Sequence, residues 1–127
     1  MTNLFKAGTL LFLINSNLTG EFNRHKQICS GLFAVDRTWQ LSIKSNNTFA
    51  YNITTINTKS SKRETREIFE GNWELRNDTL TLMESKKKIS FSFLIDKNKI
   101  IPVNQKPDTL GSFVMSLDYL EKSELAK

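Results

Sequence analysis

The fold is decided by the stretch Trp39–Leu82, which reads WQLSIKSNNTFAYNITTINTKSSKRETREIFEGNWELRNDTLTL. Its first part carries apolar residues on the odd positions and mostly polar residues on the even ones, on both sides of the polar turn 45–47. A period of two predicts half-buried antiparallel strands joined as a hairpin. The odd apolar positions are Trp39, Leu41, Ile43, Phe49, Tyr51 and Ile53.

A second hairpin follows within the same stretch. Phe69, Gly71, Trp73 and Leu75 share one parity, the pair Asn77-Asp78 is a turn signal, and the chain returns through Leu80 and Leu82. The polar connection 57–67 lies between the two hairpins. Because long unstructured loops are uncommon in small domains, it is predicted to be the solvated tip of a long hairpin with arms at 53–56 and 68–69.

The rest of the chain shows the same kind of pattern in shorter pieces. Further strands are expected at 18–24, 89–95, 100–103 and 113–117, and a turn is expected at 36–38. Residues 25–37 as a whole fit either a short strand or a turn of helix. About eight or nine short strands without a long amphipathic helix predict an all-β fold, a single eight-stranded antiparallel up-and-down barrel. Closure is expected because an open meander leaves two bare edges.

Length and composition are those of one ordinary globular domain. The 127 residues are 39% hydrophobic and 24% charged, which excludes a membrane bundle and a disordered chain. Residues 1–16 read either as a weak secretory signal or as an N-terminal strand or short helix, residues 17–120 as the barrel, and 121–127 as a C-terminal tail. If this segment is a signal peptide, the protein is expected in the periplasm or outside the cell, and otherwise in the cytoplasm. No transmembrane segment is expected.

Basic residues give the chain a formal net charge of +5 and gather in predicted turns. Nucleic-acid binding is not predicted, because base contacts need arginines and stacking aromatics together on one face. Loop lysines usually keep sheet edges and turns soluble. The alternative is a contact with an acidic protein partner, and the candidate residues for it are Lys59, Lys62, Arg63 and Arg66.

Several of these motifs resemble a known group of proteins. The runs Gly71-x-Trp73-x-Leu75-x-Asn77-Asp78-Thr79-Leu80-x-Leu82 and Leu94-Ile95-Asp96-x-Asn98-x-Ile100-Ile101-Pro102 are similar to those of small bacterial lipocalin-like proteins. The resemblance covers roughly residues 17–119. It implies a lipocalin-like barrel, in a group with many secreted or lipid-anchored members, and it implies no reaction.

Chemically reactive residues are scarce. His25 and Cys29 would share a face if their segment were helical, but a zinc site needs two further ligands, and a catalytic dyad needs an orienting partner. Cys29 is therefore predicted to be a small buried apolar residue. We expect no enzyme activity, no metal and no cofactor.

Aromatic residues of the inward parity are the main functional candidates. They form either a packed core or the wall of a cavity for a small apolar ligand, and Trp73 is expected to plug the barrel floor. The predicted function is a non-enzymatic module that binds such a ligand. The alternative is a protein-interaction role, as an inhibitor, immunity or envelope-assembly protein, through the outer surface and the basic loops. The candidate ligand-binding residues are Trp39, Tyr51, Phe69, Trp73, Phe91 and Phe113.

Overall fold

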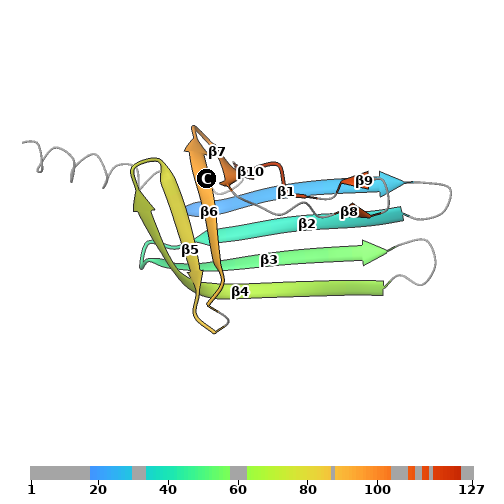
Figure 1. The fold of residues 1–127 in the computed structure, drawn as a ribbon, viewed down its shortest axis with the longest axis horizontal. Helices are drawn as coiled ribbons and strands as arrows, with labels where there is room; N and C mark the ends of the chain where they lie inside the picture. Colours follow the sequence, from blue (N-terminus) through green and yellow to red (C-terminus); the bar gives the residue numbers. More distant parts are fainter. Residues whose placement is uncertain are drawn as a thin grey trace, which may run out of the picture.

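A computed structural model describes residues 18–29, 34–57, 63–86, 88–103, 109–110, 113–114 and 116–123. Eight of its strands form a closed antiparallel barrel in the order β1-β10-β7-β6-β5-β4-β3-β2, which confirms the predicted fold class (Figure 1). Two further short strands, β8 and β9, pair only with each other. The strands are β1 Gly20–Cys29, β2 Ala34–Ile43, β3 Thr48–Asn57, β4 Arg63–Arg76, β5 Thr79–Glu84, β6 Ser90–Asp96, β7 Lys99–Val103, β8 Thr109–Leu110, β9 Phe113–Val114 and β10 Leu120–Lys122.

The turns at one end of the barrel rely on residues that tolerate a left-handed backbone. Asn47 and Asn77 have φ angles of 68° and 55°, a region that asparagine enters more readily than most residues. The backbone N–H of Trp73 donates to the Asn47 carbonyl at 2.9 Å, which ties β4 to the β2–β3 turn. These turns fix the register, so the alternation of the sequence decides which side chains enter the barrel.

The barrel interior holds one apolar cluster. It contains most of the predicted inward residues of the stretch 39–82 together with residues from β1, β6, β7 and β10, and Ile53 and Leu75 are partly buried against it. The two hairpins therefore face the same enclosed interior, as predicted. The buried members are Leu18, Phe22, Trp39, Leu41, Ile43, Phe49, Tyr51, Phe69, Trp73, Leu80, Leu82, Phe93, Ile100, Leu117 and Leu120.

Four strands are longer than the barrel itself. β10 pairs with β1 only at Phe22 and Asn23, and β5 pairs with β4 only from Gly71 onward. The remaining lengths of β1–β4 run on side by side beyond the barrel (Figure 1). We call this part, residues 24–29, 34–39, 53–57 and 63–67, the projecting sheet.

Two local predictions are wrong. Residues 36–38 do not form a turn but lie within β2, opposite residues 25–27 of β1, and the undecided segment 25–37 contributes strand on both sides. The closing strand is not 113–117, because β9 lies outside the barrel order and β10 completes the barrel at 120–122. The connection 57–67 is a hairpin as predicted, but its strands extend to Asn57 and Arg63. The predicted signal or N-terminal strand, 1–16, lies outside the described residues.

Candidate functional site

Three of the six predicted ligand-binding residues meet in one cluster of rings. Tyr51 on β3 and Phe69 on β4 are cross-strand partners with ring centroids 6.2 Å apart. The Phe91 ring from β6 lies 5.4 Å from Tyr51 and 5.0 Å from Phe69, and both contacts are close to edge-on. Phe93 adds a fourth ring at 6.3 Å from Tyr51. Such edge-to-face pairs are favourable arrangements of aromatic rings, so β3, β4 and β6 share an apolar wall, the ring cluster.

One polar group lies in the ring cluster. Tyr51 is only 3% exposed, and no hydrogen bond joins its hydroxyl to another residue in the described part of the chain. Burial, and secondarily the negative charge of Glu67, raises the pKa of Tyr51 far above its usual value. Glu67 is exposed and lies opposite Ile53, two residues further along β3.

The other predicted ligand-binding residues lie elsewhere. Trp73 is buried at the turn end of the barrel, where its indole N–H donates to the Lys44 carbonyl at 2.8 Å. Trp39 is buried, with the Arg37 guanidinium 5.9 Å from its ring centroid. Phe113 lies in β9, which pairs with β8 and is not one of the barrel strands, so its strand forms no part of the barrel wall.

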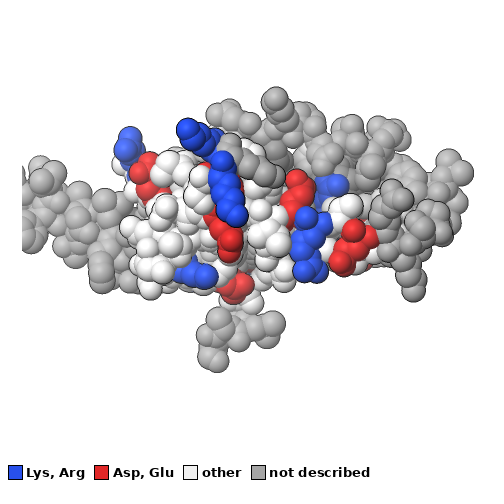
Figure 2. Space-filling model, turned by 90° about the horizontal axis from the view of Figure 1, so that it is seen from below, with Lys and Arg blue, Asp and Glu red and all other residues white. Residues whose placement is uncertain are grey.

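The predicted basic site is only partly described. Lys59 and Lys62 lie outside the described residues, and Arg63 begins β4 opposite Asn57. Arg66 is exposed and forms an ion pair of 3.7 Å with Glu64 on the same strand. On the face that Figure 2 shows, described basic and acidic side chains are interspersed rather than gathered by sign. The charge of Arg66 is therefore partly balanced by Glu64 on the same strand.

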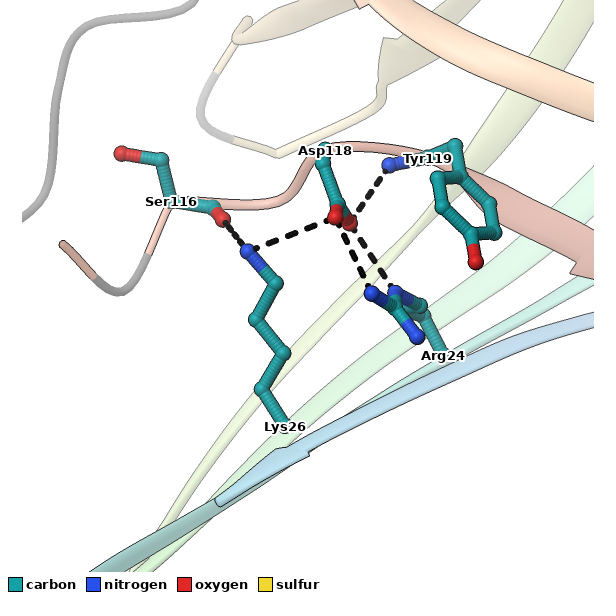
Figure 3. Close-up of polar contacts among 5 residues, drawn as sticks. All are labelled: Arg24, Lys26, Ser116, Asp118 and Tyr119. Atoms are coloured by element: carbon teal, nitrogen blue, oxygen red, sulfur yellow. Dashed lines mark hydrogen bonds and ion pairs between the residues drawn. The ribbon is translucent and has the colours of Figure 1, made fainter. Parts of the chain in front are cut away.

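A charged cluster that the sequence did not reveal fastens the C-terminal segment to β1 (Figure 3). Arg24 donates two hydrogen bonds of 3.0 Å to the Asp118 carboxylate. Lys26 donates to the Ser116 carbonyl at 2.8 Å and lies 3.6 Å from Asp118. The Tyr119 ring lies 4.4 Å from the Arg24 guanidinium, a cation–π contact. The paired geometry matches that of bidentate arginine–carboxylate bonds, which orients the chain as it enters β10.

This cluster predicts a specific acid sensitivity. Hydrogen bonds from Arg24 lower the pKa of Asp118 to about 2. The depressed pKa means that the carboxylate stabilises the fold above pH ~4 and that this contribution is lost as the pH falls toward 2. Because Asp118 is 43% exposed and solvent screens the pair, we expect about 1 kcal/mol rather than the full value of the shift. Urea unfolding of the wild type and of Asp118→Asn, at pH 6 and at pH 2.5, measures this contribution to the free energy of unfolding.

The wild type should lose more stability on acidification than Asp118→Asn, and the two proteins should converge at low pH. An Asp96→Asn variant is the control, since that residue is also an exposed aspartate but lies at the end of β6. Equal acid dependence in the wild type and Asp118→Asn would show that the Arg24 pair contributes nothing.

His25 and Cys29 do not form a site. Both lie on the extended strand β1 rather than on a helix, and His25 contacts Asp36 of β2. Cys29 is exposed, so the prediction that it is buried is wrong. The reason is that its parity faces the outer side of the projecting sheet, with His25 and Gln27. Among the described residues, no group of three or more His, Cys, Asp and Glu side chains could hold a metal ion.

The chain was compared with protein-family models, curated proteins and solved structures, and none of the three comparisons found a match. The closed eight-stranded antiparallel barrel is compatible with a calycin-like fold. In the described part of the chain, no helix has the length and apolar character needed to span a membrane.

Proposed function

We propose that this protein is a lipocalin-like, non-enzymatic binding module that holds a small, mainly apolar ligand with one hydrogen-bonding group against the ring cluster. The observation that carries the proposal is the buried Tyr51 hydroxyl, which has no hydrogen-bond partner among the described residues. A buried hydroxyl without a partner costs free energy. A ligand that forms a hydrogen bond with the Tyr51 hydroxyl recovers that cost, which favours binding at the ring cluster.

The surroundings of Tyr51 fit such a ligand. Apolar walls with a few placed polar groups are typical of small-molecule sites. Tyr51 and Phe69 are buried, whereas Phe91 and the neighbouring Ile53 are only partly buried against the core. Ile53 belongs to the projecting sheet, so the less buried border of the ring cluster includes that side. The ligand class that this favours is an aromatic or aliphatic molecule with a single hydroxyl, amine or carbonyl group.

A matched pair of probes tests the role of the hydroxyl. We expect wild-type protein to bind 1-naphthol more tightly than 1-methylnaphthalene, which has the same ring system but no hydrogen-bonding group. The variant Tyr51→Phe should bind 1-naphthol about 5- to 10-fold more weakly, the value of one hydrogen bond, and should bind 1-methylnaphthalene unchanged. Isothermal titration calorimetry measures the four affinities.

Two controls accompany this experiment. Tyr51→Phe removes an unpaired buried hydroxyl, so its thermal stability should equal or exceed that of the wild type, which excludes unfolding as the cause of weaker binding. Leu94→Ala alters an exposed apolar residue of the outer surface and should leave both affinities unchanged. Equal losses for both probes in Tyr51→Phe, or no binding of either probe to the wild type, would contradict the proposal.

A protein-interaction role is the second candidate, and one observation favours it. Leu94 and Ile101 are cross-strand partners on the outer face of β6 and β7, and both are exposed, at 46% and 37%. Exposed apolar neighbours of this kind are typical of protein contacts. Native mass spectrometry of protein purified from its own host distinguishes the two, because a bound small molecule supports the first candidate and a bound polypeptide the second.

A further inference from the structure

The edge of β4 has backbone groups that no described strand uses. β4 pairs with β3 along its whole length, but its pairing with β5 begins only at Gly71. Residues 63–67 therefore form an edge strand of the projecting sheet, and residues 68 and 69 continue this edge toward β5. Unpaired edges are templates for the addition of another strand, and proteins usually protect them with charges.

The backbone groups on this edge belong to the even-numbered residues. The Glu70 carbonyl accepts a hydrogen bond of 3.1 Å from the Ser85 N–H, so it points away from β3. The pairing of β4 with β3 is continuous from residue 63 to 72, and backbone direction alternates along a strand. Glu64, Arg66 and Ile68 therefore direct their N–H and C=O groups toward the free edge.

The order of charges along this edge is complementary to the same edge of a second copy that runs antiparallel to it. In a symmetric antiparallel pair of two β4 edges, opposed residues lie on the same face, so even residues must oppose even ones. A register centred on Thr65 sets Glu64 against the partner's Arg66, and Arg66 against the partner's Glu64. Opposite charges then face each other at positions 64 and 66, and such cross-strand pairs are stabilising.

The neighbouring registers lack this property. A centre at Arg66 opposes that arginine to itself, and a centre at Glu67 opposes Glu67 to itself and Glu64 to Glu70. Like charges directly opposite each other are destabilising. We propose that the β4 edge, residues 63–67, pairs antiparallel with the same edge of a second copy, in the register centred on Thr65, to form a symmetric dimer.

Charge reversal at Glu64 and at Arg66 tests the pairing. Glu64→Arg alone would set arginine against arginine, and Arg66→Glu alone would set glutamate against glutamate. We expect the wild type to approach a mass of twice 14.6 kDa at high concentration in sedimentation equilibrium. Each single variant should dimerise at least 10-fold more weakly. Mixed in equal amounts, the two variants should form a heterodimer, because every opposed pair is then again of opposite charge.

Hydrogen exchange identifies the surface involved. As the wild-type concentration rises, the amides of Glu64 and Arg66 should exchange at least 10-fold more slowly, whereas those of Thr65 and Glu67, which face β3, should change little. Both single variants alter exposed side chains, and circular dichroism should confirm that they fold. A wild type that stays monomeric, variants that dimerise like the wild type, or a mixture that does not associate would each overturn the proposal.

Discussion

Replacing Gly71 with alanine is expected to lower the free energy of unfolding by more than about 3 kcal/mol, a large part of the marginal stability of a small domain. A Cβ atom at this position would overlap the carbonyl oxygen of Met83 and lie 3.0 Å from its carbonyl carbon and 3.1 Å from the Glu84 Cα. All three are backbone atoms, so no side-chain rotation relieves the overlap. β5 would have to move away from β4 where their pairing begins.

The sign of the change in unfolding free energy distinguishes a steric overlap from the usual effect of a glycine-to-alanine substitution. In a strand with free space, glycine to alanine usually stabilises by roughly 0.5–1 kcal/mol, because glycine loses more conformational freedom on folding. Urea unfolding followed by tryptophan fluorescence measures the change. Glu74→Ala, an exposed position on the same strand, should stay within about 0.5 kcal/mol of the wild type. A Gly71→Ala protein as stable as the wild type would show that β4 and β5 do not approach each other as described.

Phe93→Ala is expected to cost about 3–5 kcal/mol, the range for removing a large buried aromatic side chain. Phe93 is 2% exposed, lies opposite Leu80 and Pro102 on the neighbouring strands, and contacts the Tyr51 ring. Its removal would leave a cavity beside the ring cluster and lose the dispersion contacts of the neighbouring rings. The change should be seen in the denaturant midpoint without a change in the slope m.

The adjacent residue provides the matched control. Leu94 is 46% exposed and faces the outer surface, so Leu94→Ala should cost less than about 1 kcal/mol. A larger loss for Leu94→Ala than for Phe93→Ala would mean that β6 presents its opposite face to the interior. The assignment of odd-numbered β6 side chains to the barrel interior would then be wrong.

The sequence predicted the barrel where apolar residues alternate without interruption. Register follows parity in a half-buried sheet, so Tyr51, Phe69 and Phe91 could be expected to face one interior before their strands were placed. Their convergence with Phe93 follows from β3, β4 and β6 lining the same barrel. The pattern of polar and apolar residues does not specify side-chain positions. It therefore could not predict that the Tyr51 hydroxyl lacks a hydrogen-bond partner among the described residues.

The prediction failed where inward positions are charged. Arg24 and Lys26 of β1 and Arg37 of β2 have the inward parity, so the alternation is hidden there. The physical reason is that these side chains meet polar partners rather than an apolar layer. Arg24 binds Asp118, which is 94 residues away in the sequence, and Arg37 donates to Thr55 at 2.9 Å. Short local windows cannot show such contacts, and the closing strand β10 was missed for the same reason.

The position of a bound ligand tests the central proposal most directly. Intermolecular nuclear Overhauser effects between 1-naphthol and the protein can be recorded with isotope-labelled aromatic and methyl groups. We expect Overhauser effects between 1-naphthol and the rings of Tyr51, Phe69 and Phe91. In Tyr51→Phe, the effects from the naphthol protons next to the hydroxyl group should be lost. Effects confined to the exposed methyl groups of Met83, Leu94 and Ile101 would place the probe on the outer surface and contradict the proposed ligand site.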